Sequence, residues 1–269
     1  MTTHRFTYNA TEVIPYIDWN YFFHAWNIGH RSHKTQTALQ LKEEAIALTR
    51  EMNPVVTSLF RLCEARSNGD SIELEGTTLP LLRQQHSRAG EPNLCLSDFV
   101  SPKSDKVALF ATAVSPEFEK ERSEEDPYRS MLIQTIADRL AEAATSLMHK
   151  TVRTSKEYWG YSPDEKLSIE QLNIEKYQGI RPAVGYPSLP DQSVIFIIDK
   201  LLNLKEAGIE LTESGAMIPH ASVCGIMLSH PAAHYFAVGN ICDEQLIDYS
   251  HRRGISSVEL RKYLVKNIG

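Results

Sequence analysis

The sequence of 269 residues has no excess of positive charge: 28 lysines and arginines face 34 aspartates and glutamates, which gives a formal net charge of −6. Nucleic-acid binders usually present a basic patch, so the composition argues against that kind of partner. No apolar run approaches the ~18 residues of a membrane-spanning helix, and the N-terminus has no signal-peptide core. These absences predict a cytoplasmic protein with neither nucleic-acid nor membrane partners.

Common catalytic signatures are also missing. The sequence contains no GxSxG motif, no P-loop and no GxGxxG motif that opens a helix. The four cysteines show no CxxC spacing, and without a secretion signal we interpret them as reduced thiols. The sequence therefore gives no support for the usual hydrolase, nucleotide-binding or disulfide-stabilised classes.

Residues of the types that bind zinc gather in one late segment. They are His220, Cys224, His230, His234 and Cys242. Their spacings match neither a zinc finger nor an HExxH helix, and Pro231 prevents His230 and His234 from pairing in mid-helix. We expect no metal site here, and we interpret Cys224 and Cys242 as buried thiols of a hairpin. A metal-dependent hydrolase that uses this cluster stays as an alternative.

The composition, 42% hydrophobic and 23% charged, is that of a globular protein with a sizeable core. We expect a single domain over residues 1–269. Helical segments and antiparallel hairpins follow one another without strict β-α alternation. This order predicts the α+β class, with an antiparallel sheet flanked by several helices, rather than a doubly wound parallel sheet.

Helices are predicted by apolar spacing and by capping signals. Residues 35–52 carry apolar side chains at three- and four-residue steps. Asp126-Pro127 predicts the start of a long helix, and "SIEQ" at 168–171 opens a short one that ends at Gly179. Further helices are expected at 79–85, at 194–208 and in two C-terminal segments, one closed by Gly254 and one opened by "SSVE" at 256–259.

Strands are predicted by β-branched and aromatic residues between turn signals. "VVTSLFRLCEARSNGDSIELEG" predicts a hairpin that turns at Asn68-Gly69, and "KVALFATAV" predicts a strand covered on both faces. "ASVCGIMLSH" and "YFAVGNI" predict a second hairpin across "PAAH". The charged run "EKERSEED" at 119–126 is interpreted as a solvated loop.

One segment fits neither a linker nor a buried strand. "KYQGIRPAVGYPSLPDQ" has three prolines, two glycines and two tyrosines around a single internal charge, Arg181. Acidic residues also stand at unusual places: Asp18 within "YIDWNYFFHAW", Glu142 in the predicted long helix, and Glu175 shortly before the arginine. Each carboxylate could be solvated or capping, or the three could surround a cationic ligand.

These segments resemble the activation (reactivation) domain of cobalamin-dependent methionine synthase. The matching stretches are "YIDWNYFFHAW", "LRQQ…NLCLSDFVSP", "DRLAEA", "YWGYSPDEKLSIEQL…EKYQGIRPAVGYPSLPD", "LTESGAMIPHASVCG", "SHPAAHYFAVGNI" and "CDEQLIDYSHRRG". They run in the family's order across nearly the whole chain. The Arg-Pro-Ala-x-Gly-Tyr-Pro core and the downstream Leu-Thr-Glu-Ser are the most specific of them.

The resemblance implies a binding site for S-adenosylmethionine, with Arg181 fixing the ligand from within the proline-rich core. Guanidinium suits the ligand's carboxylate, while its ammonium and sulfonium suit carboxylates and aromatic faces. The implied binding residues are Asp18, Glu142, Glu175, Arg181, Ala183, Gly185, Tyr186, Tyr235 and Phe236. No side chain is implied to be catalytic, because a sulfonium methyl group passes directly to a metal nucleophile without proton transfer.

The implied activity is a methyltransferase component of methionine biosynthesis. In the family, a flavodoxin-type donor supplies one electron to inactive cob(II)alamin, and S-adenosylmethionine then gives methylcobalamin. Because the 269 residues include no cobalamin module, we expect the cobalamin to be carried by a separate methionine synthase chain. Alternatives are the reactivation of another corrinoid methyltransferase and a non-catalytic S-adenosylmethionine sensor.

The sequence departs from the family's usual core at a few positions. Val184 stands where a proline is usual, Ser188-Leu189 replace the common Ala-Cys, and Cys224 falls where serine is frequent. None of these changes removes a charged group of the implied site.

Overall fold

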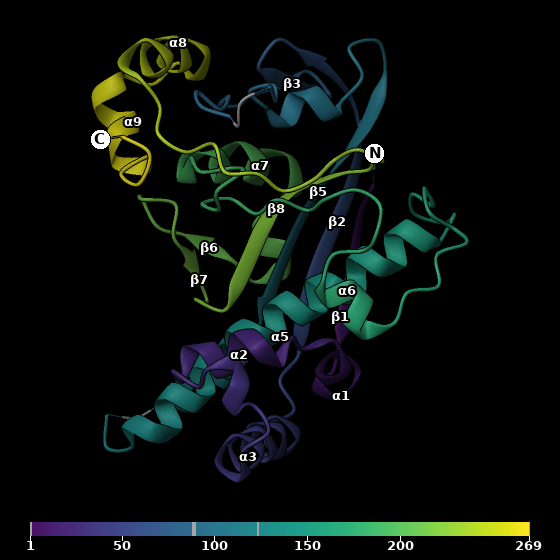
Figure 1. Cartoon of the computed structure of the whole chain (residues 1–269), viewed down its shortest axis with the longest axis vertical. Coiled ribbons are helices and arrows are strands. Elements are labelled where there is room, and N and C mark those ends of the chain that lie inside the picture. Colours follow the sequence, from purple (N-terminus) through teal and green to yellow (C-terminus); the bar gives the residue numbers. More distant parts are fainter. Residues whose placement is uncertain (1, 88–89, 123, 269) are drawn as a thin grey trace.

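The computed structural model describes residues 2–87, 90–122 and 124–268 (Figure 1). Within these residues it has an antiparallel six-stranded sheet of order β4-β3-β2-β5-β8, in which β1 also pairs with β2, and a two-stranded sheet β6-β7. The strands are β1 (Thr3–Tyr8), β2 (Val56–Asn68), β3 (Ser71–Leu74), β4 (Thr77–Pro80), β5 (Asp105–Val114), β6 (Glu210–Leu211), β7 (Met217–Ile218) and β8 (Ser222–Leu228). This architecture confirms the α+β class.

Helices cover both faces of the large sheet and extend beyond its ends (Figure 1). The α-helices are α1 (Ala10–Val13), α2 (Trp19–Ala25), α3 (Gln36–Met52), α4 (Pro116–Lys120), α5 (Pro127–Thr154), α6 (Ile169–Asn173), α7 (Ile195–Leu202), α8 (Asp243–Arg253) and α9 (Ser257–Tyr263). The 3-10 turns are η1 (Ile14–Tyr16), η2 (His30–Ser32), η3 (Leu96–Phe99), η4 (Gln192–Val194) and η5 (Leu204–Ala207). No helix in the described part of the chain is long and apolar enough to cross a membrane.

Strands β2 and β5 form the centre of the sheet and are buried on both faces. Phe60 of β2 pairs with Phe110 of β5, and both pack with Met148 of α5. The alternate residues, including Leu59 and Leu109, pack toward α7 on the opposite face. Covering on both sides explains why the predicted strand at 106–114 reads as a continuous apolar run.

Helix α5 joins the two halves of the core. Asp126 caps it by accepting a hydrogen bond from the backbone N–H of Arg129 (2.9 Å), and Pro127 occupies its first turn, as predicted. Its first half packs against α1, α2 and α3, and its second half packs on the sheet. The middle of α5 therefore lies where the N-terminal helices meet the sheet.

The proline-rich segment lies along the outer edge of β8. Ile180 and Leu228 exchange two backbone hydrogen bonds (2.9 Å each), Val184 N–H donates to the carbonyl of Cys224 (2.9 Å), and Ile226 N–H donates to Pro182 (3.1 Å). Proline is tolerated at such an edge because its missing N–H is not needed by a further strand. This pairing fixes the backbone around Arg181 although the segment is irregular.

Two predicted elements are wrong. Residues 79–85 do not form a helix, because the backbone continues β4 and Leu81 N–H donates to Asp70 (2.8 Å). "YFAVGNI" at 235–241 is not a strand: Val238 N–H donates to Pro187 and Ile241 N–H to Asn267 (2.9 Å each), so Val238 and Ile241 are buried without a ladder.

Three smaller expectations also need correction. The helix opened by "SIEQ" ends at Asn173 and not at Gly179. Glu119 is not part of a solvated loop: it lies in α4 and accepts hydrogen bonds from the backbone of His220 (3.2 Å) and Ala221 (2.6 Å). Cys242 is exposed rather than buried.

Candidate functional site

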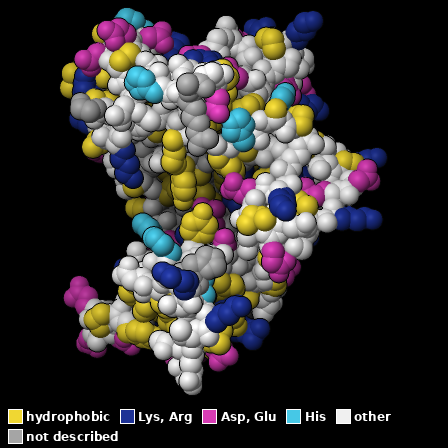
Figure 2. Space-filling view, viewed as in Figure 1, with side chains coloured by type: hydrophobic (Ala, Val, Ile, Leu, Met, Phe, Trp, Pro, Cys, Tyr) yellow, Lys and Arg dark blue, Asp and Glu magenta, His cyan; other side chains and the backbone are white. Residues whose placement is uncertain are grey.

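A cavity of about 530 Å³ lies where the N-terminal helices, the middle of α5 and the edge of the sheet meet. Figure 2 shows hydrophobic side chains gathered in a hollow between the part of the molecule that bears α8 and α9 and the part that bears α2. The walls come from five segments of the sequence: residues 16–21, 139–146, 172–177, 181–188 and 235–237. The volume is in the range of small-molecule sites, roughly 300–1,000 Å³.

The structure brings together eight of the nine residues expected to bind ligand. Those that line the cavity are Asp18, Glu142, Glu175, Arg181, Ala183, Tyr186, Tyr235 and Phe236. Gly185 is not among the lining residues, and its backbone N–H donates to the carbonyl of Leu189 (2.9 Å) in a tight turn. Its φ of +83° and a Cβ position 2.6 Å from the Gln192 side chain explain why glycine stands there.

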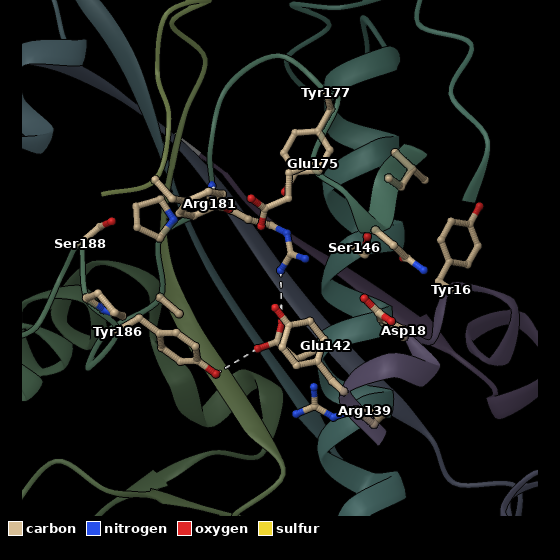
Figure 3. Close-up of a pocket in the computed structure, with 18 of the residues that line it drawn as sticks. Tyr16, Asp18, Arg139, Glu142, Ser146, Glu175, Tyr177, Arg181, Tyr186 and Ser188 are labelled. Carbon is tan, nitrogen blue, oxygen red and sulfur yellow. Dashed lines mark hydrogen bonds and ion pairs between the residues drawn. The ribbon is translucent and has the colours of Figure 1, made fainter. Parts of the chain in front are cut away.

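Arg181 and Glu142 form the polar centre of the cavity (Figure 3). A guanidinium Nη1 donates to Glu142 Oε2 (3.2 Å), and the hydroxyl of Tyr186 donates to Oε1 of the same carboxylate (3.4 Å). The carboxylate, followed by burial, raises the pKa of Tyr186, so the phenol keeps the proton that it donates. The hydroxyl of Tyr235 accepts the backbone N–H of Arg181 (3.0 Å).

The N-terminal wall carries Asp18 at the start of α2. Its Oδ1 accepts the backbone N–H of Asn20 (2.9 Å), a capping bond that fixes the side chain at the cavity edge. Tyr21 lies under the guanidinium of Arg139 (5.7 Å to the ring centroid), a cation–π contact. The "YIDWNYFFHAW" segment thus supplies both a carboxylate and aromatic faces.

Glu175 holds its carboxylate at the site through an unfavourable backbone conformation. It follows α6 with φ +57°, where Lys176 N–H donates to Gln171 and Glu175 N–H to Leu172 (3.0 Å each). This is a Schellman motif, in which glycine is the usual residue at the left-handed position. Partial desolvation of the carboxyl group raises its pKa, and nearby Glu142 acts in the same direction while Arg181 opposes it.

Substitution of Glu175 by glycine is therefore expected to stabilise the fold while weakening ligand binding. The left-handed strain is relieved, which adds about 1 kcal/mol to the free energy of unfolding. Urea unfolding measures this gain. The control Glu175→Gln keeps the strain and loses only the charge, so the difference in unfolding free energy between the two variants isolates the strain. A loss of stability in Glu175→Gly would contradict the assignment of strain.

Beneath the cavity, a buried ion pair supports Tyr177. Arg153 donates to both carboxylate oxygens of Glu165 (3.0 and 2.6 Å), and its guanidinium lies 4.4 Å from the Tyr177 ring centroid. His149 is fully buried beside them, its ring 5.0 Å from Tyr177 and its Nε2 3.0 Å from the hydroxyl of Tyr161. Burial, followed by the charges of Arg153 and Arg181, lowers the pKa of His149 well below its ordinary 6.5.

His149 is expected to make the protein less stable in mild acid. The folded state keeps this imidazole neutral, whereas the unfolded chain binds a proton below its ordinary pKa of about 6.5. The contribution of His149 to the free energy of unfolding is therefore fully present above that pH. It falls by about 1.4 kcal/mol between pH 7.5 and 5.5. Urea unfolding at the two pH values should show a drop smaller by that amount in His149→Gln. An equal drop in both proteins would contradict this assignment.

The late histidines and cysteines do not converge. Cys224 is buried in β8, Cys242 contacts Gln85, and His220 faces Asp138 of α5 (3.5 Å). His230 and His234 both pack against the ring of Phe99. Among the described residues, no group of three His, Cys, Asp or Glu side chains could hold a metal ion.

Several polar lining residues were not predicted from the sequence. They are Tyr16, Tyr21, Arg139, Ser146, Asn173, Tyr177 and Ser188. Two of them had a detectable signal, because Arg139, Glu142 and Ser146 form a polar stripe at helical spacing on α5. The two tyrosines of the N-terminal wall belong to the aromatic segment that had already been singled out for Asp18.

Two comparisons with known proteins found similarity over most or all of the chain. The family model for the activation domain of vitamin B12 dependent methionine synthase matches residues 9–254. A crystal structure of the MetH reactivation domain bound to AdoHcy superposes with a TM-score of 0.93 at 34% sequence identity. That match covers 100% of this chain and 91% of the other.

Proposed function

This chain belongs to the activation-domain family of vitamin B12 dependent methionine synthases, and on that premise we propose that it binds S-adenosylmethionine in the cavity around Arg181. The observation that carries the proposal is the meeting of carboxylates, guanidinium groups and tyrosine rings in one cavity of suitable volume. The matched reactivation domain is bound to AdoHcy, a ligand that differs from the proposed one by a single methyl group.

The charges of the cavity suit this ligand. Three carboxylates, Asp18, Glu142 and Glu175, face two guanidinium groups, Arg139 and Arg181, which leaves one formal negative charge. S-adenosylmethionine has an ammonium, a sulfonium and a carboxylate, and so one formal positive charge. Opposite charges within a partly desolvated cavity attract more strongly than they do in water.

Arg181 retains hydrogen-bonding capacity for the ligand's carboxylate. One guanidinium nitrogen bonds to Glu142, while the buried Nε has no hydrogen-bond partner within the described residues. A buried polar group without a partner is rare in native proteins and is explained when a ligand supplies one. The planar fork of the guanidinium matches a carboxylate in two parallel bonds.

In this proposal the chain positions a methyl donor and leaves the nucleophile to its partner. Cobalamin, carried by a methionine synthase chain, supplies the nucleophile when a flavodoxin-type donor has reduced it. The residues of this chain bind and orient the ligand, exclude water and need not move a proton. The exposed rings of Tyr186 and Tyr235 border the cavity, where the partner would approach.

Calorimetric titration with S-adenosylmethionine tests the proposal. We expect the wild type to bind and Asp18→Asn to bind about tenfold more weakly, since asparagine keeps the helix cap and removes only the charge. Glu117→Gln, which changes an exposed charge on α4, serves as the matched control. Adding the chain, S-adenosylmethionine and a one-electron reductant to oxidised cobalamin-bearing enzyme should then restore turnover. Absence of binding, with and without that enzyme, would contradict the proposed function.

A further inference from the structure

Two irregular segments form one wall of the cavity, residues 181–188 and 235–237. The second belongs to the connection between β8 and α8, which has no helix or strand within residues 229–242. Such a connection has no ladder to fix its geometry, so its backbone is held by individual hydrogen bonds to other segments, beside the packing of side chains such as Phe236 against Phe99. The accuracy with which Tyr235 and Phe236 are placed therefore depends on those bonds.

Ser188 supplies a two-way bond to this connection. Its hydroxyl donates to the carbonyl oxygen of Phe236 and accepts the backbone N–H of the same residue (3.1 Å). The serine is buried, with 6% of its surface exposed. A serine hydroxyl has one donor and two acceptor sites, so a single side chain satisfies both backbone polar groups of Phe236.

The Ser188 bonds close a ring of contacts around Arg181. Ser188, seven residues after Arg181, bonds to the backbone of Phe236. The residue before it, Tyr235, accepts the backbone N–H of Arg181 with its hydroxyl (3.0 Å), which closes the ring. Pro187 adds a parallel bond to Val238 (2.9 Å). The backbone of Arg181 is thus fixed from both ends, and Figure 3 shows Ser188 on the same side of the cavity as Tyr186.

We propose that Ser188 is a positioning residue that holds Tyr235 and Phe236 in place beside Arg181. Ligand affinity then depends on Ser188 indirectly, because its hydroxyl bonds to the backbone of the cavity wall. The inference rests on the proposed function for its ligand, S-adenosylmethionine. Its structural part, the immobilisation of the 235–237 segment, is independent of any ligand.

Hydrogen exchange of the whole chain without ligand tests the structural part. In Ser188→Ala, backbone amides of residues 233–238 should exchange about tenfold faster, which corresponds to the loss of two hydrogen bonds, while amides of α5 and β2 stay unchanged. Ser146→Ala, which removes another serine hydroxyl of the cavity wall from the rigid helix α5, is the control and should leave residues 233–238 as in the wild type. Unchanged exchange in Ser188→Ala would overturn the proposal.

Titration with S-adenosylmethionine tests the positioning role. We expect a Kd about tenfold weaker in Ser188→Ala. Ser188→Thr keeps the hydroxyl and should restore both the slow exchange and the affinity. Faster exchange with unchanged affinity in Ser188→Ala would overturn the positioning role. If the wild type itself binds no S-adenosylmethionine, the proposed function fails, while the exchange result still decides whether Ser188 immobilises the segment.

Discussion

Replacement of Gly225 by alanine is expected to displace the Arg181 segment from β8 and to abolish ligand binding. A Cβ at this position would lie 2.2 Å from the carbonyl oxygen of Pro182 and 2.8 Å from the Cα of Ala183. Both obstacles are backbone atoms, so no rotamer change can relieve the clash. The segment must move away, which breaks the bonds from Val184 to Cys224 and from Ile226 to Pro182.

The expected cost is about 3 kcal/mol in the free energy of unfolding, from overpacking and two lost backbone hydrogen bonds. Urea unfolding measures it, and titration with S-adenosylmethionine should show no binding. Gly29→Ala is the matched control, because a Cβ there meets nothing within 4 Å. A Gly225→Ala protein with wild-type stability and affinity would show that the close crossing is not needed.

The helices that the sequence predicts well are those whose signals are local. Asp126 and Pro127 begin α5, Gly254 ends α8 and Ser256 caps α9, as expected from the residues themselves. A capping bond joins groups at most a few residues apart, so a short window of sequence contains everything that decides it. The apolar spacing of residues 35–52 is local in the same sense, and α3 follows it.

The elements that were predicted wrongly depend on distant partners. "YFAVGNI" has the composition of a strand, yet its backbone groups bond to Pro187, Ser188 and Asn267 instead of to a neighbouring strand. The expected helix at 79–85 fails for a related reason, because Arg83 extends to Asp70 and Asp98 and fixes an irregular backbone. The residues within either segment do not predict these contacts, because the partners lie elsewhere in the sequence.

The candidate site shows the same division between local and distant information. Asp18, Glu142, Glu175 and Arg181 are linked by resemblance to a family, and the structure places all four around one cavity. Helical spacing alone would have added Arg139 and Ser146 to Glu142. Ser188 was noted only as a departure from the family's usual core, and its bonds to Phe236 emerge only when two segments about fifty residues apart are placed side by side.

Arg181→Ala is expected to produce the largest loss of affinity among single side-chain changes at the site. The variant loses the guanidinium fork proposed for the ligand's carboxylate and leaves that carboxylate desolvated beside Glu142. Charge-assisted bonds of this kind contribute about 3 kcal/mol, so the Kd for S-adenosylmethionine should rise on the order of a hundredfold. The effect on folding should be far smaller, because Glu142 retains 29% exposure and can be solvated.

Two further variants separate charge from geometry. Arg181→Lys keeps the positive charge but not the planar fork, so its affinity should lie between those of the wild type and Arg181→Ala. Tyr186→Phe removes only the long bond to Glu142 (3.4 Å) and should change the Kd little. Calorimetric titration of the three variants provides the comparison. If Arg181→Ala binds as tightly as the wild type, the carboxylate must be held elsewhere, and Arg139 would be the next guanidinium of the cavity to replace.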